Sequence, residues 1–148
     1  MEIKIFKVGK EKPEEVEIRC HEMTEEVREI VAFVKTRQGQ LTGMLEGKQF
    51  EIAVTDVAYV EAVDNKVFLY TQKQVYETRQ KLYELEELLR EKFFLRVSKS
   101  MLVNLMKIKS IKPALNGRML AVLKSGEEIL ITRKYVGDLK KALRGERV

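Results

Sequence analysis

The amino-acid sequence predicts a mainly β protein with short helices, in the α+β fold class. From residue 40 onward, short apolar runs with polar breaks follow one another, which is typical of strands. Turn dipeptides lie between these runs: Asn116-Gly117, a strong signal for a type I′ hairpin turn, and Ser125-Gly126. Apolar residues recur at helical spacing only in short segments. Together these patterns indicate many short strands joined by tight turns.

The first 40 residues predict a small β-β-α unit. Residues 2–8 and 15–20 alternate polar and apolar side chains and indicate two half-buried strands. A helix is expected to follow, with Thr24 as its N-cap and Gly39 at its end. Its apolar stripe comprises Val27, Ile30, Val31 and Val34. Because such a unit is too small to be stable alone, we expect residues 1–40 to serve in dimerisation or regulation.

Residues 41–148 are predicted to form a second, larger domain. The expected strands are residues 50–63 with a bend near Thr55-Asp56, residues 66–71, 74–78 and 94–97, a segment from Met101, and the runs flanking Asn116-Gly117 and Ser125-Gly126. The expected helices are residues 80–91 and a closing helix from Arg133.

The charges are unevenly distributed along the chain. Residues 92–148 contain 14 basic and 4 acidic side chains, a net charge of +10, whereas the whole chain carries +5. A basic block on a structured segment is typical of a protein with a polyanionic partner. A solvated lysine surface would give the same composition, so charge alone leaves both interpretations open.

The composition gives little support for an enzyme or a metalloprotein. Cys20 is the single cysteine and His21 the single histidine, and adjacent strand residues point to opposite faces. We therefore expect Cys20 in the core, His21 at the surface, and no catalytic residue, metal site or cofactor. The N-terminus lacks a secretory signal and no apolar run is long enough to span a bilayer, so a cytoplasmic protein without membrane insertion is expected.

Three polar segments interrupt the predicted strands and contain cations. They are Asp64-Asn65-Lys66, Ser98-Lys99-Ser100 and Thr132-Arg133-Lys134. Hydroxyl groups beside lysine or arginine are common contacts to phosphates and base edges. Each segment could also be an ordinary polar turn. As a set, they would let a β scaffold present cations to nucleic acid.

The sequence resembles the LytTR DNA-binding domain family over about residues 50–143. Four segments carry the resemblance: "DVAYVEAVDNKVFLYT", "YETRQKLYELEELL", "FFLRVSKSMLVNLMKIKSI" and "GRMLAVLKSGEEILITRKYVGDLKKAL". The resemblance implies an elongated fold of mostly antiparallel strands, with loops that enter DNA grooves. Nothing before residue 40 resembles a receiver domain, so a stand-alone bacterial transcriptional regulator is expected.

By this resemblance, specific residues are expected to contact DNA. They are Asn65, Lys66, Arg79, Ser98, Lys99, Ser100, Arg133 and Lys134. Arg96 and Asn104 also match the family pattern, but we interpret them as structural: Asn104 would bond backbone at a strand end, and Arg96 would pair with an acid such as Glu61. Many family members have His-Arg-Ser where this chain has Ser98-Lys99-Ser100. Lysine lacks the bidentate fork of arginine, so base recognition there is expected to be weaker or to depend on Arg133.

The expected function is therefore sequence-specific binding of double-stranded DNA, as a homodimer on repeated half-sites. Two alternatives remain at the level of sequence. One is a protein interaction module that partners a membrane or signalling regulator. The other is RNA binding, although RNA readers need exposed aromatic side chains and most aromatics of this chain lie in apolar runs.

Overall fold

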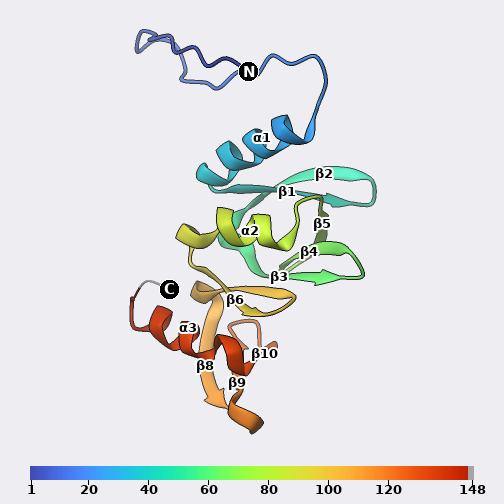
Figure 1. Ribbon diagram of the computed structural model, residues 1–148, viewed down its shortest axis with the longest axis vertical. Helices are drawn as coiled ribbons and strands as arrows, with labels where there is room; N and C mark the ends of the chain where they lie inside the picture. The colour runs from blue at the N-terminus through green and yellow to red at the C-terminus, as the bar shows by residue number, and fades with distance from the viewer. Residues whose placement is uncertain (147–148) are drawn as a thin grey trace.

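Short hairpins assemble into two antiparallel sheets stacked along an elongated molecule (Figure 1). The computed structural model describes residues 1–146. The larger sheet has the strand order β2-β1-β5-β4-β3-β7-β6. Its strands are β1 (Gln40–Leu45), β2 (Lys48–Ala53), β3 (Val57–Val63), β4 (Lys66–Thr71), β5 (Val75–Thr78), β6 (Phe94–Ser98) and β7 (Met101–Asn104). The smaller sheet contains β8 (Ile108–Pro113), β9 (Met119–Leu123) and β10 (Glu128–Ile131), in the order β10-β9-β8.

Within residues 1–146, three α-helices accompany the sheets: α1 (Glu25–Arg37), α2 (Leu82–Leu88) and α3 (Arg133–Leu143). The Thr24 hydroxyl accepts a hydrogen bond from the Val27 amide at 3.3 Å and caps α1, as predicted. The predicted helix at 80–91 is shorter than expected, because a 3-10 turn at Arg90–Lys92 follows α2. No helix among residues 1–146 is long and apolar enough to cross a bilayer.

The turn signals of the sequence are confirmed. Asn116 and Gly117 both have positive φ, 61° and 74°, as a type I′ turn requires. Gly126 has a φ of 95° in the turn between β9 and β10. The bend predicted near Thr55-Asp56 is a 3-10 turn, Val54–Asp56, between β2 and β3. Residues that adopt a positive φ thus determine where these strands end.

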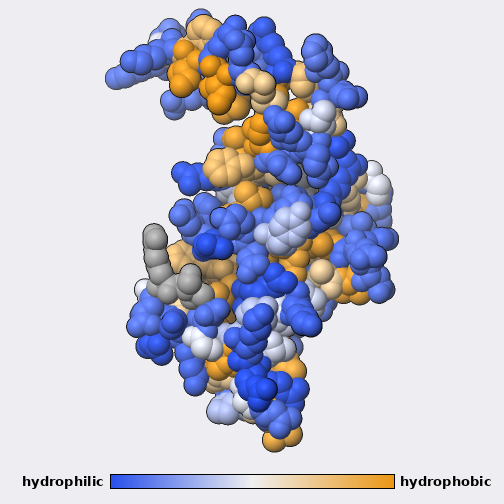
Figure 2. All heavy atoms as spheres, viewed as in Figure 1, coloured by the Kyte–Doolittle hydropathy of each residue, from blue (hydrophilic) through white to orange (hydrophobic). Residues whose placement is uncertain are grey.

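The two strands predicted at residues 2–8 and 15–20 are not formed. The N-terminal arm, residues 1–23, contains no strand or helix, and its apolar side chains are exposed apart from the half-buried Ile18; Ile3 and Ile5 are 89% and 87% exposed. Figure 2 shows these apolar side chains at the top of the molecule. Alternating side chains form a strand only where a neighbouring strand supplies hydrogen bonds and a core buries the apolar face. An isolated hairpin is only marginally stable in water. Cys20 is exposed for the same reason, contrary to the prediction, whereas His21 is exposed as predicted.

Each sheet has its own apolar core. Helix α2 packs on the seven-stranded sheet through Leu82, Leu85 and its C-cap residue Leu89. They contact buried sheet residues such as Val60 and Leu69. The second cluster joins Val97 and Val103 of the larger sheet to the three-stranded sheet and to Leu139 of α3. The alternating strand residues and the two helix stripes therefore bury their apolar faces, and the chain segments between them stay at the surface.

Tyr59 joins the two sheets through a polar contact. Its hydroxyl donates a 2.7 Å hydrogen bond to Glu127 in the β9–β10 turn, and its ring stacks on Tyr70 with centroids 4.3 Å apart. Burial, together with the hydrogen bond to Glu127, raises the pKa of Tyr59 well above its ordinary value. The phenol therefore remains protonated, and remains a donor, at neutral pH.

Asn104 is a buried polar residue at the end of β7, only 3% exposed. Its side-chain nitrogen donates to the Val57 carbonyl oxygen at 2.9 Å, and its side-chain oxygen accepts from the Met106 amide at 3.0 Å. The structural role predicted for Asn104 is thereby confirmed. It satisfies two backbone groups where β7 turns toward the smaller sheet.

Asn104→Ala should lower the free energy of unfolding by about 1–3 kcal/mol, because the change leaves a buried carbonyl without its partner. Chemical denaturation of the full chain measures this. Gln72→Ala, at an exposed position in the β4–β5 turn, is the matched control and should stay within about 0.5 kcal/mol of the parent. Equal stability of the two variants would contradict a structural role for Asn104.

Candidate nucleic-acid interface

The β3–β4 and β6–β7 turns lie at the same end of the seven-stranded sheet. Asp64 and Asn65 form the β3–β4 turn, with positive φ of 51° and 63°, and Lys66 begins β4. The Ala62 amide donates to the Ser100 carbonyl oxygen at 2.8 Å, which holds one turn beside the other. The antiparallel pairing of β3 with β7 therefore brings Lys66 and Lys99 to one edge.

A bulge in β6 precedes the turn that contains Lys99. The register of β6 against β7 shifts between Arg96 and Ser98, and Lys99 and Ser100 then form the turn. The Ser98 hydroxyl oxygen accepts a hydrogen bond from the Ser100 amide at 3.3 Å. This bond leaves the hydroxyl proton of Ser98 available, while the Lys99 side chain is exposed.

Arg96 stabilises this turn from within the protein. Its guanidinium donates to the carbonyl oxygens of Ser98, at 2.7 Å, and of Lys99. It also forms a 2.7 Å ion pair with Glu86 of α2. The structural interpretation of Arg96 is therefore confirmed, but the suggested partner Glu61 is wrong: Glu61 accepts from the Tyr70 hydroxyl at 3.3 Å instead. Helix α2 supplies the acid because it lies against β6.

The third polar segment reaches the same edge from the smaller sheet. The Thr132 amide and hydroxyl both donate to the Val97 carbonyl oxygen, at 3.0 and 3.4 Å. Arg133 and Lys134 follow in the first turn of α3, and both side chains are exposed. The Lys134 ammonium lies 5.5 Å from the centre of the Tyr135 ring. Contact with the β6 end thus places Arg133 next to the turn of Lys99 in the fold.

A fourth turn, the predicted Asn116-Gly117 turn between β8 and β9, lies beside Arg133. The sequence analysis did not predict that this turn belongs to the site. A Cβ atom added to Gly117 would lie 2.9 Å from Cδ of Arg133, so the β8–β9 turn packs against the arginine side chain. Arg118 follows in this turn and donates from Nε to the Leu115 carbonyl oxygen at 2.9 Å. A cation next to the Asn116-Gly117 signal was the available clue, but only the fold shows that this turn meets α3.

Arg79 differs from the residues of the three polar segments in what surrounds its side chain. Pairing of Thr78 with Val67 puts it near the β3–β4 end of the sheet. Its side chain, however, lines a cleft of about 210 Å³ between α1 and α2. The other lining residues are Glu25, Arg28, Glu29, Ala32, Gln80 and Glu84. Acidic neighbours make this cleft a poor place for a phosphate.

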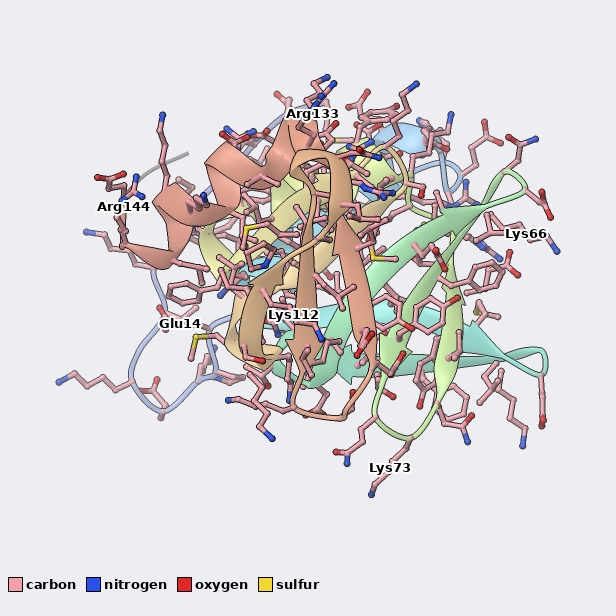
Figure 3. All side chains as sticks on the ribbon, turned by 90° about the horizontal axis from the view of Figure 1, so that it is seen from below. Glu14, Lys66, Lys73, Lys112, Arg133 and Arg144 are labelled. Atoms are coloured by element: carbon pink, nitrogen blue, oxygen red, sulfur yellow. The ribbon has the colours of Figure 1, made fainter. Side chains whose placement is uncertain are left out.

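The cations of the three polar segments have no acidic partners. Within residues 1–146, no carboxylate oxygen lies within 4.0 Å of the charged nitrogens of Lys66, Lys99, Arg133 or Lys134. In Figure 3, Arg133 lies at the top of the molecule and Lys66 at its right-hand side, while Lys73 of the β4–β5 turn lies at its lower edge. In the described part of the chain, no group of three His, Cys, Asp or Glu side chains could hold a metal ion.

The structure thus brings together most of the residues predicted to contact DNA. Asn65 and Lys66, Ser98 to Ser100, and Arg133 with Lys134 gather at one edge, which we call the turn edge. It combines unpaired cations with hydroxyl donors on rigid turns. Such a surface can bind the phosphates and base edges of a nucleic acid.

Known proteins share this sequence and this fold. Residues 47–144 match the LytTr DNA-binding domain family. The structure superposes with a TM-score of 0.68 on the LytTr DNA-binding domain of a methyl-accepting/DNA response regulator from Bacillus cereus, at 26% identity over 71% of this chain and 96% of that chain.

Curated relatives include the sensory transduction protein LytT from Bacillus anthracis, 32% identical over 83% of this chain and 49% of that protein. LytT from Bacillus cereus is 34% identical over 63% of this chain and 38% of that protein. The HTH-type transcriptional regulator SAS2254 from Staphylococcus aureus strain MSSA476 is 28% identical over 97% of this chain and 98% of that protein. The chain therefore spans less than half the length of the two LytT proteins.

The resemblance drawn from residues 50–143 is confirmed by the family match, and the mainly antiparallel α+β architecture by the structural match. The family match covers all four turns and α3. The chain belongs to the LytTr DNA-binding domain family.

Proposed function

We propose that the protein is a transcriptional regulator that binds double-stranded DNA in a sequence-specific manner and contacts it through the turn edge. The observation that carries this proposal is the convergence of Lys66, Lys99 and Arg133 on one edge, where they are exposed and have no carboxylate partner within residues 1–146. Because isolated unpaired cations repel one another, their gathering on rigid turns favours an anionic ligand.

The start of α3 adds a second feature suited to phosphate. The Thr132 hydroxyl bonds to Val97 and does not cap the helix, so the first amides of α3 have no side-chain cap. Uncapped amides at a helix N-terminus favour anions. Arg133 and Lys134 sit in that same helical turn. We assign contacts to DNA phosphates to the first amides of α3, to Lys134 and to Lys99.

Base recognition is assigned mainly to Arg133. Its planar guanidinium can donate two parallel hydrogen bonds to guanine in the major groove, which a lysine cannot do. Asn65 and Lys66 approach from the neighbouring turn, and Ser98 and Ser100 supply hydroxyl donors. Arg79 has no part in this assignment, because its side chain lines the cleft between α1 and α2. Two protomers would bind repeated half-sites, with affinity increased by their linkage.

A selection of bound duplexes from a random pool, at fixed salt concentration, tests the function itself. We expect one enriched motif in two copies, and an affinity whose logarithm falls by about 0.9 for each phosphate contacted per tenfold rise in salt. About four to seven contacts per protomer fit the number of donors. No enrichment together with a salt-independent affinity would refute DNA recognition by this protein.

Substitution of two cations should separate the two kinds of contact. Arg133→Ala should cost about 1–3 kcal/mol of binding free energy at the selected site and relax the preference at one base pair. Lys99→Ala should weaken selected and random duplexes alike and reduce the salt slope by about 1, because phosphate contacts carry no sequence information.

Lys73→Ala is the matched control for these substitutions, since Lys73 is an exposed cation in the β4–β5 turn, away from the turn edge. Affinities for both duplexes and melting temperatures are measured for all three variants. Melting temperatures should be unchanged. A Lys99→Ala variant that melts several degrees lower yet binds DNA normally would show that the Ser98–Ser100 segment serves packing.

Arg96→Lys should weaken DNA binding without removing any charge. Lysine cannot reach both turn carbonyls and Glu86 at once, so the turn that presents Lys99 would lose its support. We expect a stability loss of about 1–2 kcal/mol and a fall in affinity for selected and random duplexes. Arg90→Lys, which alters an exposed ion pair with Glu87, is the control. Unchanged affinity of Arg96→Lys, measured below its melting temperature, would contradict the positioning role.

A further inference from the structure

The N-terminal arm contains a strand-like segment that has no partner in the single chain. Residues 2–5 alternate polar and apolar side chains, which puts Ile3 and Ile5 on one face of an extended segment and Phe6 on the other. Ile3, Ile5 and Phe6 are at least 80% exposed. Within the described residues, the only backbone hydrogen bonds of the arm are two local ones, at Lys12 and Thr24. An extended segment with free backbone donors and acceptors and exposed apolar side chains is suited to strand addition.

The seven-stranded sheet offers an open edge of matching length. β2 is the last strand of the sheet on one side and pairs with β1 alone, without a register shift over its six residues. Most β2 side chains are exposed, including Phe50, which is 38% exposed. Natural edges are usually protected by bulges, prolines or covering elements. β2 has no proline and no bulge, and α1 packs mainly on β1.

The side-chain patterns of the two segments agree. On β2, Phe50 and Ile52 share one face and Glu51 points to the other. On the arm, Ile3 and Ile5 share one face and Lys4 points to the other. When Lys4 lies opposite Glu51, Ile3 and Ile5 lie beside Ile52 and Phe50 in both strand directions. An apolar face then continues onto the added strand. On the other face Lys4 comes near Glu51, whose carboxylate also forms a 2.7 Å ion pair with Lys35 of α1.

We propose that residues 2–8 of one protomer add as a strand to the β2 edge of a second copy, and that two such exchanges form the dimer. The single chain contains both the arm and the edge, and within residues 1–146 both are unpaired. A second copy supplies the same two elements in a reciprocal arrangement, as a two-fold symmetric dimer requires. The arm, α1 and β2 lie together at the N-terminal end of the molecule (Figure 1), so this interface uses neither α3 nor the β8–β9 turn.

This inference rests on the dimer proposed above and not on the DNA contacts, so it is tested without DNA. Sedimentation of the full chain over a range of concentrations should show a dimer. The double variant Ile3→Lys with Ile5→Lys should raise its dissociation constant at least about tenfold, because two lysines replace the buried face. Val16→Lys with Met23→Lys adds the same charge to exposed positions of the arm outside residues 2–8, and should leave the constant unchanged.

Crosslinking identifies which chain the arm joins. Cys20 is first replaced by serine. One chain then carries Lys4→Cys and a second, differently tagged chain carries Gln49→Cys, both at exposed positions. A short bis-maleimide should join the two chains as a heterodimer in preference to either homodimer. A third chain, with both cysteines, distinguishes exchange from closure of the arm on its own β2.

Each other outcome overturns the inference in a recognisable way. If the protein is a monomer at every concentration, the proposed dimer is refuted, and the DNA contacts are still tested by the experiments described for them. If the dimer forms equally well with Ile3→Lys and Ile5→Lys, the proposed role of the arm is refuted, although the protein is a dimer. A crosslink within one monomeric chain shows that the arm closes on its own sheet. Circular dichroism of both double variants should match the parent.

Discussion

The carbonyl oxygen of Val97 holds the two sheets together at the turn edge. It accepts hydrogen bonds from both the amide and the hydroxyl of Thr132, at 3.0 and 3.4 Å, and β6 and α3 pack against each other around this point. The position of Arg133 and Lys134 at the turn edge follows from this contact, because Thr132 is the last residue before the helix that begins with Arg133. The shared apolar cluster and the bond from Tyr59 to Glu127 also join the two sheets, but the Thr132 contact is the one that lies directly before Arg133.

Stability and the proposed DNA recognition use largely different residues in this protein. The two cores contain the alternating apolar residues of the strands and the leucines of α2 and α3, and they exclude the cations of the turns. Arg96 connects the two sets, since it bonds the backbone of the Lys99 turn on one side and Glu86 on the other. Such a residue explains how a turn, ordinarily a mobile element, can hold a lysine in a defined position. Because the turn is already ordered in the folded protein, binding of a ligand does not incur the entropy cost of ordering it.

Much of this fold was predictable from local sequence, because strand alternation and turn dipeptides report conformations that neighbouring residues determine. The strands from residue 57 to 131 and the Asn116-Gly117 turn follow from such signals. The prediction of strands in the arm was wrong for a physical reason. The pattern in residues 2–8 shows that the segment is able to form a strand, but it does not show whether a partner strand is present. At the turn edge, polar breaks identified the turns. The choice of Glu86 over Glu61 by Arg96, and the contact of Gly117 with Arg133, depend on how distant elements cross, which spacing does not encode.

The exposed side chains of the turn edge have one evolutionary consequence. Lys66, Lys99 and Arg133 contribute no ion pair to the fold within residues 1–146, so replacing them costs the scaffold little. The backbone positions beneath them are constrained, because Asp64 and Asn65 both need positive φ. Related regulators could therefore diverge in target preference by exchanging a few surface residues while they retain the same architecture. Paralogues within one genome could acquire separate targets in this way without passing through an unstable intermediate.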